Sequence, residues 1–413
     1  MDIKRALVAS FAMLAVAGLI GCNSGGSGSG KIGGGSSAES RLAERNKERK
    51  RDKAPDPVQD KIVIGVYGDF TGTNSTFGQD TKEGVAIALE EANAAGGVLG
   101  LPIEVVEEDT RTDQTQARNA VTKLIQKDKV LAVLGEVASS MSIAGGKVCD
   151  QYGVPMITPS STNPKVTDIG QYIFRVCFLD DFQGTSMARY AVNDLGIKKI
   201  AILYDVESDY SVGLKDFFKA ELAKLGGEVT HELSFKPADT DYRSQLTTIK
   251  NSKAEAIYIP GYYKSVGSIA RQARELGISA KLLGGDGWSS SELIPGAGGP
   301  GKALEGAYFT DHFSALDPNE DVQNFVKKYE AKFKKKPSAL AALAYDAAKV
   351  LFQSIESAGS QDRAKLRDAI ANIKDFKGVT GTFSINEHGD VLKTITIVQV
   401  KGNEFVMVKT LEP

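Results

Sequence analysis

The sequence contains few of the side chains that most often carry catalysis or bind metals: its 413 residues include three cysteines, three histidines and one tryptophan. His231, His312 and His388 lie far apart and form no HxxxH or HExxH pair. The chain also lacks a CxxC pair and a GxSxG nucleophile turn, and no GxGxxG loop follows its first predicted strand. We therefore expect no cofactor and no metal ion, and an enzyme is the function that the motifs favour least. Cys149 and Cys177 could pair, or could be buried separately as small apolar side chains.

An excess of either charge is also missing. The chain has 50 basic and 52 acidic residues and a formal net charge of −2, and the part after residue 60 is mildly acidic. A nucleic-acid-binding domain usually shows a basic patch, so we expect no nucleic acid partner. The length and an apolar content of 42% are typical of two or three domains with buried cores.

Long hydrophobic runs are absent except for one near the N-terminus. Ala6–Ile20 is almost wholly apolar, but at about fifteen residues it is shorter than the roughly twenty that a membrane-spanning helix needs. Two basic residues precede it and the tetrapeptide LIGC ends it, an arrangement that indicates a secretory signal. The end resembles a bacterial lipobox. We expect residues 1–21 to be a lipoprotein signal peptide and Cys22 to carry lipid, which anchors the protein outside the cytoplasm, in the periplasm or at the cell surface. An ordinary signal peptide with a chance cysteine is the alternative.

Residues 22–60 are predicted to form a flexible tether. Residues 23–40 are rich in glycine and serine, a composition typical of linkers. The run Arg41–Lys53 is dominated by charged side chains. This run could rest on anionic lipid headgroups, or could be a solvated spacer.

From residue 61 onward, short apolar segments alternate with amphipathic ones. KIVIGVYG and KKIAILYD are typical of buried strands, whereas Gln114–Gln126 has the apolar spacing of a helix. The alternation runs in two rounds of about 120 residues each. It predicts an α/β protein with two doubly wound parallel-sheet lobes joined by crossing hinge segments. The expected parts are lobe 1 over 61–180, lobe 2 over 181–309, a return to lobe 1 over 310–390, and a terminal segment of lobe 2 over 391–413.

Polar and aromatic side chains follow the predicted strands, at the edge where open α/β sheets bind ligands. In the first round these segments are Ala138-Ser139-Ser140 and Pro159-Ser160-Ser161-Thr162. In the second round they are Ser208-Asp209-Tyr210, Gly261-Tyr262-Tyr263 and Gly285-Asp286-Gly287-Trp288. Hydroxyls and amides can hold a carboxylate, an acidic group can hold an ammonium, and aromatic rings can enclose an apolar side chain. The set suits a small zwitterion.

These segments, in this order and spacing, resemble the type I periplasmic binding proteins, and among them the leucine/isoleucine/valine-binding proteins of ABC transporters. The resemblance covers about residues 61–400 and includes IGVYGDFTGTNSTFGQD, EANAAGGVLG, LGEVASS, VPMITPSST, IYIPGYY and GGDGW. It implies a type I periplasmic binding protein fold. The implied function is an extracytoplasmic solute-binding lipoprotein, which captures an amino acid by closure of its lobes and delivers it to the permease subunits of an ABC importer.

The resemblance also implies roles for polar residues. Ser139, through its hydroxyl and N–H, and Thr162 would bind the ligand carboxylate. The Ser160 carbonyl, the Thr162 hydroxyl and Asp286 would bind the ammonium. Ser139 and Thr162 could instead cap helices, and Asp286 could stabilise a glycine-rich turn.

Aromatic residues would enclose the ligand in the same comparison. Phe77, Tyr210 and Tyr262 would line or cap the pocket, and Trp288 is a further candidate. Phe77 and Tyr262 could instead be core residues.

The chain departs from the family at two places. The position of Asp286 often holds glutamate in branched-chain binders, and Ser160-Ser161 is often alanine-rich. The shorter carboxylate and the two added hydroxyls could favour a polar side chain on the ligand. A branched-chain or other aliphatic amino acid is the expected ligand; the alternative is a tethered sensor of the same fold that binds an amide or another small metabolite.

Overall fold

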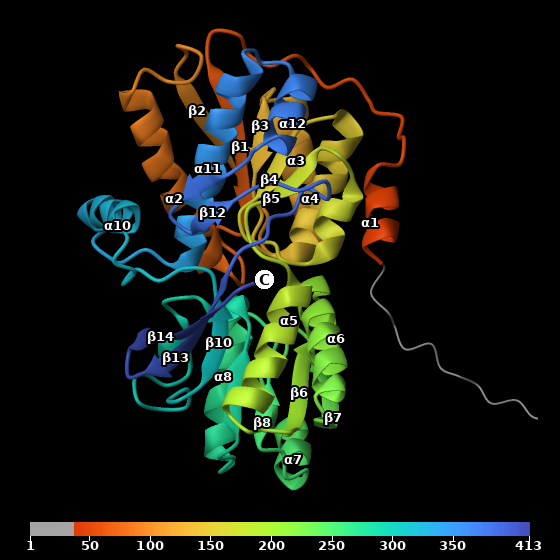
Figure 1. The fold of residues 1–413 in the computed structure, drawn as a ribbon, viewed down its shortest axis with the longest axis vertical. Helices are drawn as coiled ribbons and strands as arrows, with labels where there is room; N and C mark the ends of the chain where they lie inside the picture. The colour runs from red at the N-terminus through yellow and green to blue at the C-terminus, as the bar shows by residue number, and fades with distance from the viewer. Residues whose placement is uncertain (1–36) are drawn as a thin grey trace, which may run out of the picture. The chain divides into compact units, whose positions relative to one another are not determined.

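The computed structural model describes residues 37–413. The expected signal peptide, the lipidation site Cys22 and the first part of the expected tether lie outside this range. The described chain forms two lobes, each with a central sheet flanked by helices (Figure 1). This arrangement confirms the expected α/β class with two doubly wound lobes.

Lobe 1 is built on a parallel sheet with the order β2-β1-β3-β4-β5. Its strands are β1 (Ile62–Gly68), β2 (Ile103–Asp109), β3 (Ala132–Leu134), β4 (Met156–Thr158) and β5 (Ile173–Arg175). The helices between them are α2 (Ser75–Ala94), α3 (Gln114–Gln126), α4 (Ser139–Tyr152) and the 3₁₀ helix η1 (Pro164–Ile169). Because the strand order reverses between β1 and β3, the adjacent crevice is where such a sheet binds ligands.

Lobe 2 is built on a seven-stranded sheet with the order β14-β13-β10-β9-β8-β6-β7. Its strands are β6 (Lys199–Asp205), β7 (Glu228–Phe235), β8 (Ala256–Tyr258), β9 (Lys281–Gly284), β10 (Tyr308–Asp311), β13 (Ile395–Lys401) and β14 (Glu404–Leu411). Its helices are α5 (Asp180–Arg189), the π-helix η2 (Tyr190–Asp194), α6 (Asp209–Lys224), α7 (Arg243–Asn251), α8 (Tyr263–Glu275), the 3₁₀ helix η3 (Asp286–Trp288) and α9 (Leu293–Gly296).

One edge of lobe 2 differs from the expected parallel sheet. β13 runs antiparallel to β10, and β14 runs antiparallel to β13. Only Gly402 and Asn403 separate β13 from β14, and a two-residue loop can join only antiparallel neighbours.

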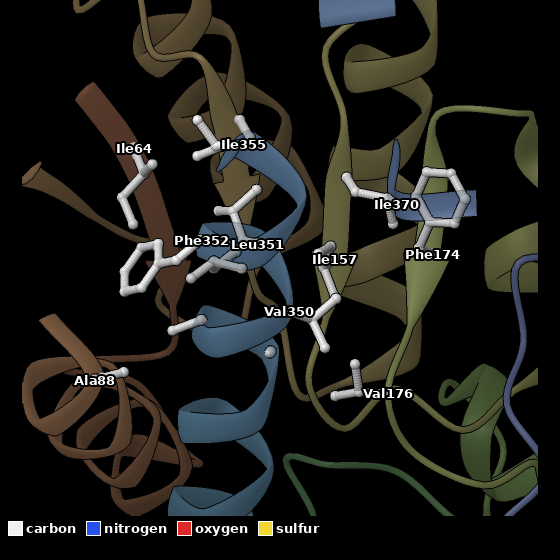
Figure 2. Close-up of a cluster of buried hydrophobic side chains, with 14 of the residues drawn as sticks. Ile64, Ala88, Ile157, Phe174, Val176, Val350, Leu351, Phe352, Ile355 and Ile370 are labelled. Atoms are coloured by element: carbon white, nitrogen blue, oxygen red, sulfur yellow. The ribbon is translucent and has the colours of Figure 1, made fainter. Parts of the chain in front are cut away.

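Between the two visits to lobe 2 the chain returns to lobe 1. The returning elements are α10 (Glu320–Phe333), α11 (Ala339–Ala358), α12 (Arg363–Ala371), β11 (Phe376–Gly378) and β12 (Gly381–Phe383). Helix α11 packs against α2 and covers the sheet. Figure 2 shows Leu351 and Phe352 of this helix beside Ile64 of β1 and Ala88 of α2, in one buried cluster. The returning segment thus completes the core of the first lobe.

Three segments cross between the lobes, at 176–179, 312–319 and 384–394. They are packed together by two contacts. The His312 ring stacks on the Phe178 ring with centroids 3.6 Å apart, and the Lys393 Nζ donates to the Val176 carbonyl at 3.1 Å. Burial lowers the pKa of the Lys393 ammonium to about 8.

Two expectations are corrected or decided by the fold. The flexible tether is wrong from residue 38 onward, because Ala38–Arg45 forms helix α1 and the buried Arg45 side chain binds carbonyl groups of lobe 1. Cys149 and Cys177 are both buried and free, so they form no disulfide with each other and are buried separately. No helix between residues 37 and 413 combines the length and the apolar content needed to cross a bilayer.

Candidate functional site

The lobe 1 half of the candidate site comes from the loops after β3 and β4. Ser139 is the first residue of α4, is 1% exposed, and accepts a hydrogen bond at Oγ from the Asn163 N–H at 3.3 Å. Ser160 is buried, and its Oγ has no hydrogen-bond partner among the described residues. Thr162 is also buried. A buried hydroxyl without a partner is costly, so Ser160 offers an unused polar atom to a ligand.

Ser161 differs from the expectation that it is a ligand-binding residue. Its Oγ lies 2.6 Å from the Ser142 Oγ and donates toward the Glu136 carbonyl at 2.8 Å. Its N–H donates to the Thr158 Oγ1 at 3.0 Å. Since the hydroxyl is used inside lobe 1, Ser161 shapes the loop and is corrected from a ligand contact to a structural residue.

Glu136, at the end of β3, organises this half of the site. Its carboxylate accepts from the Thr110 hydroxyl at 2.8 Å and from the Ala138 N–H at 2.6 Å. Its carbonyl accepts hydrogen bonds from the hydroxyls of Ser142, Thr158 and Ser161. Burial raises the pKa of the Glu136 carboxyl to about 8, against the lowering effect of the Thr110 and Ala138 hydrogen bonds.

The lobe 2 half is centred on Asp286, which follows β9 in η3 and is buried. Its Oδ1 accepts from the Tyr210 hydroxyl at 2.9 Å, and its Oδ2 lies 2.9 Å from the His312 Nε2. Burial lowers the pKa of the His312 imidazole, despite the nearby Asp286 carboxylate. A neutral imidazole and a phenol are both uncharged donors, so these two side chains leave the Asp286 charge available to a cation.

A chain of contacts joins the two halves. The Asp180 N–H donates to the Thr162 carbonyl at 3.0 Å, the Gln183 Nε2 donates to the Asp180 Oδ1 at 3.2 Å, and the Asp286 N–H donates to the Gln183 Oε1 at 2.7 Å. Ser139 joins the same assembly through Asn163. The predicted polar residues of the two lobes are therefore joined by one chain of contacts and do not lie on separate surfaces.

Asp180 is a second buried carboxyl that the sequence argument did not select. Its Oδ2 has no hydrogen-bond partner among residues 37–413. Burial raises the pKa of the Asp180 carboxyl well above its ordinary value, and the neighbouring Asp286 raises it further.

Aromatic rings close the site between the lobes. Tyr210 and Tyr262 stack with centroids 5.2 Å apart and planes 9° apart. Phe77 of α2, from lobe 1, meets the Tyr262 ring edge-on at 5.7 Å. This arrangement brings together the three aromatic residues selected from the sequence.

Trp288 is corrected to a core residue. It is fully buried, its Nε1–H donates to the Ile259 carbonyl at 2.9 Å, and its ring packs near the Phe309 ring within the lobe 2 core. A Cβ added at Gly284 would lie 2.0 Å from the indole, so the ring fills the space above β9.

The lobes also contact each other directly, so the structure has a closed arrangement. The Ser140 Oγ donates to the Asp209 Oδ2 and accepts from the Asp209 N–H, both at 3.0 Å. The Asn163 Nδ2 donates to the Asp209 carbonyl at 2.7 Å. On the α2 side, the hydroxyls of Thr76 and Ser290 lie 3.0 Å apart.

The residues that sequence reasoning missed are Glu136, Asp180, Gln183 and His312. Glu136 lies in the LGEVASS segment, and Asp180 and Gln183 follow the boundary between the two rounds, so position in the pattern was a usable signal for three of them. His312 lies in a crossing segment that has no periodic pattern. Only the tertiary structure brings it to Asp286.

Comparison with known proteins places this arrangement among solute-binding proteins. A family described as "Periplasmic binding protein" matches residues 61–404. An "Amino acid binding protein" of Pseudomonas aeruginosa is 37% identical over 74% of this chain and 80% of its own length. A "Leu/Ile/Val-binding protein homolog 3" of Brucella melitensis is 32% identical over 80% of this chain and 88% of its own length.

Solved structures agree with these relatives. A leucine binding protein of Thermotoga maritima, LivK, has a TM-score of 0.82 and 42% identity, and the match covers 85% of this chain and 99% of that one. The branched-chain amino acid transporter substrate binding protein LivJ of Streptococcus pneumoniae, in complex with isoleucine, has a TM-score of 0.81 and 32% identity. That match covers 86% of this chain and 100% of LivJ.

The raised pKa of Glu136 makes a prediction about stability. Because the folded-state pKa of about 8 exceeds the ordinary value of 4.5, protonation favours the folded state. The stabilisation is complete below the ordinary pKa and is lost as the pH rises through the folded-state pKa. In the wild type, the unfolding free energy should therefore fall as the pH rises from about 5.5 to about 7.5. We expect this fall to be smaller in Glu136→Gln by roughly 1–3 kcal/mol, measured by urea denaturation.

The exposed Glu228 of β7 provides the control for this measurement. Glu228→Gln should leave the pH dependence of the unfolding free energy as it is in the wild type. Parallel curves for the wild type and Glu136→Gln would contradict the assignment of a proton to Glu136.

Proposed function

Because the chain belongs to the family of periplasmic binding proteins, we propose that it captures an amino acid between its lobes and delivers it to the permease of an ABC importer. The ligand we propose is branched-chain or otherwise aliphatic. One observation carries this proposal: buried hydroxyl and N–H groups of lobe 1 and the Asp286 carboxylate of lobe 2 belong to a single interlobe assembly. The relatives that bind leucine and isoleucine support it.

In the proposed complex the ligand carboxylate binds the Ser139 hydroxyl and N–H together with Thr162. The ligand ammonium binds the Ser160 carbonyl, the Thr162 hydroxyl and Asp286. The position of Ser139 at the start of α4 favours a carboxylate there, since helix N-termini have free N–H groups and a positive dipole end.

The apolar side chain of the ligand would pack against the aromatic rings. Phe77 comes from lobe 1, and Tyr210 and Tyr262 come from lobe 2. Because the rings come from both lobes, the apolar wall is complete only in the closed arrangement.

Closure of the lobes is the proposed mechanism of capture. Lobe 1 binds the ligand first, and Asp286 and the tyrosines then arrive from lobe 2. A ligand that contacts both lobes shifts the equilibrium toward the closed state by its difference in affinity for the two states. The closed protein would then dock on the permease.

A sensor that binds an amide or another small metabolite is a second candidate. The observation that favours it is the Ser160 hydroxyl, which has no hydrogen-bond partner among the described residues. Such an atom would be satisfied by a polar group on the ligand and not by an aliphatic side chain.

A thermal-shift screen separates these candidates. We expect one or more aliphatic amino acids to raise the unfolding temperature by several degrees at about 1 mM, because a ligand that binds only the folded state stabilises it. The panel contains the twenty amino acids, small amides and organic acids. Stabilisation by amides alone would favour the sensor, and stabilisation by organic acids alone would contradict a role for Asp286 in binding an ammonium.

The role of Asp286 has its own test. We expect Asp286→Asn to weaken binding of L-leucine by about tenfold or more in calorimetry, because hydrogen bonds to charged groups contribute about 1.5–3 kcal/mol. Asparagine has nearly the shape of aspartate and keeps one acceptor oxygen for the Tyr210 hydroxyl, so the variant removes the charge with little change in shape. Asp181→Asn, at an exposed position of α5, is the control and should bind as the wild type does. Unchanged affinity in Asp286→Asn would remove this residue from the ammonium site.

We also propose that the protein is a lipoprotein anchored through Cys22 and acts outside the cytoplasm. The sequence LIGC after the apolar run supports this proposal. We expect the wild type to incorporate labelled palmitate and to sediment with membranes, and Cys22→Ser to do neither. Absence of label from the wild type would favour an ordinary signal peptide.

A further inference from the structure

Residues 37–60, which we call the strap, precede the part of the chain that matches the binding-protein family, 61–404. The strap packs along lobe 1 and contains helix α1. Figure 1 shows α1 beside the upper lobe. There it packs against η1. Four arginines of the strap contact this lobe; they are Arg41, Arg45, Arg49 and Arg51.

Arg45 fixes the helix of the strap. Its side chain is buried, and its Nη1 donates to the carbonyls of Thr167 at 3.0 Å, Gly170 at 2.6 Å and Ile173 at 2.7 Å. The guanidinium carbon lies 5.1 Å from the centre of the Phe174 ring. Arg45 therefore ties α1 to η1 and to the start of β5.

The rest of the strap is fixed at separate points. Arg51 donates to the Asp150 carboxylate and carbonyl, both at 3.0 Å. Ala54 is buried in the α3–α4 side of the lobe 1 core. The Arg363 Nη1 donates to the Pro55 carbonyl at 2.7 Å. None of these contacts involves the loop that carries Thr162.

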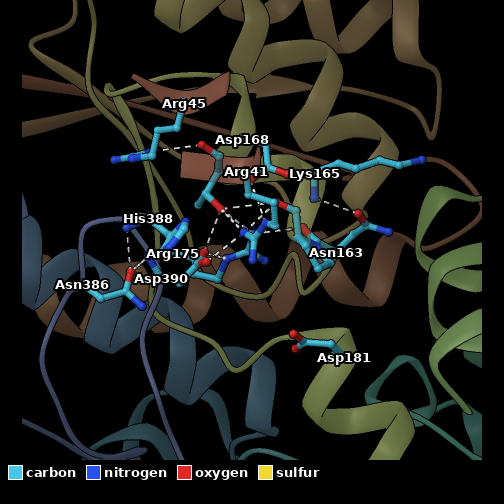
Figure 3. Close-up of polar contacts among 12 residues, drawn as sticks. Arg41, Arg45, Asn163, Lys165, Asp168, Arg175, Asp181, Asn386, His388 and Asp390 are labelled. Carbon is cyan, nitrogen blue, oxygen red and sulfur yellow. Dashed lines mark hydrogen bonds and ion pairs between the residues drawn. The ribbon is translucent and has the colours of Figure 1, made fainter. Parts of the chain in front are cut away.

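Arg41 differs, because it joins a network behind that loop whose inner members, Arg175 and Asp390, are buried (Figure 3). Its Nε donates to the Asp168 Oδ1 at 2.8 Å, and its Nη2 donates to the Asp390 Oδ2 at 2.9 Å. The other Asp390 oxygen accepts from the Arg175 Nε at 2.7 Å. Two arginines and two aspartates thus form a network in which the formal charges balance.

Arg175 connects this network to the candidate ligand loop. Its side chain is fully buried. Its Nη1 donates to the Ser161 carbonyl, and its Nη2 donates to the Asn163 carbonyl at 2.9 Å. These two carbonyls flank Thr162. The position of the Thr162 main chain is therefore set by a guanidinium that Asp390 orients.

We propose that Arg41 is a positioning residue for ligand binding, so that docking of the strap on lobe 1 sets the affinity of the interlobe site. The proposal rests on the proposed function, because Thr162 is taken as a ligand-binding residue. The route runs from Arg41 through Asp390 to Arg175 and then to the loop Ser161–Asn163.

The charge balance explains why Arg41 matters. Without its guanidinium, Asp168 and Asp390 share one arginine, and a buried carboxylate left without its partner is strongly unfavourable. Burial by itself raises the pKa of the Asp390 carboxyl, whereas the charges of Arg175 and Arg41 lower it. The net result is a pKa below the ordinary value. With Arg41 removed, Asp390 turns toward solvent or takes up a proton, and Arg175 loses its fixed orientation.

The test compares Arg41→Ala with Arg51→Ala in the full chain. Both variants remove one strap arginine, but only Arg41 touches Asp390. We expect Arg41→Ala to weaken L-leucine binding by about tenfold in calorimetry, within the range of off-site mutations that act through a packed network. We expect Arg51→Ala to change affinity less than about twofold.

Hydrogen exchange supplies a readout that needs no ligand. The Ser161 and Asn163 amides donate to side chains of lobe 1, so a loosened loop should exchange them faster. We expect faster exchange at 160–165 in Arg41→Ala and not in Arg51→Ala. Equal exchange in the two variants would overturn the proposal whether or not leucine binds.

The remaining outcomes separate this proposal from the proposed function. If the wild type fails to bind leucine and every other amino acid, the proposed function fails while the exchange data still decide the coupling. If the loop amides exchange faster in Arg41→Ala but this variant binds leucine with the affinity of the wild type, docking of the strap does not position the site. In a chain that already carries Asp390→Asn, adding Arg41→Ala should lower the affinity for L-leucine only slightly further. A further loss as large as that of Arg41→Ala alone would show that Arg41 acts by a route that does not pass through Asp390.

Discussion

The buried ion pair between Arg175 and Asp390 is the interaction on which the arrangement of the candidate binding site depends. The two side chains are 0% and 3% exposed. Arg175 ends β5 and binds the loop after β4, while Asp390 belongs to the last segment that crosses between the lobes. Loss of one partner of a buried pair costs about 3–5 kcal/mol, because the other charge stays behind without compensation. One ion pair thus holds the candidate ligand loop to the last segment that crosses between the lobes.

The division of charge between the lobes is the physical reason for the proposed dependence of closure on a ligand. Lobe 1 contributes neutral hydroxyls and N–H groups, and lobe 2 contributes Asp286, whose side-chain partners Tyr210 and His312 are neutral donors. Closure buries the Asp286 carboxylate, and neutral donors offset only part of the desolvation cost. An ammonium between the lobes supplies the missing opposite charge. A closed state without a cation is therefore disfavoured by the same residue that would hold the ligand.

The sequence predicted what is periodic and local, and it failed where a side chain's partner is distant. Gln114–Gln126 was predicted with the bounds that the structure has, and the polar loops at the strand ends do meet between the lobes. Trp288 was misassigned because the strand-end rule locates a segment and not the direction of its ring, which turns into the core. Ser161 was misassigned for a related reason, since its neighbours Ser160 and Thr162 have the same hydroxyl chemistry. Of the three, only the Ser161 hydroxyl bonds with Glu136, which lies 25 residues earlier in the chain.

The strap shows how a run of charges can be structural although its composition indicates a solvated spacer. In Arg41–Lys53 the two basic residue types behave differently: the arginines dock on lobe 1, whereas Lys47, Lys50 and Lys53 are exposed. Arg41, Arg45 and Arg49 are four residues apart, and helix α1 places the first two on the face toward η1. A guanidinium can bind several carbonyls at once and is more weakly hydrated than an ammonium, so it is the cation that tolerates burial. The spacing of the arginines, considered apart from the lysines, separates a docked face from a solvated one. The arginine face of this run belongs to lobe 1 and is not a solvated spacer.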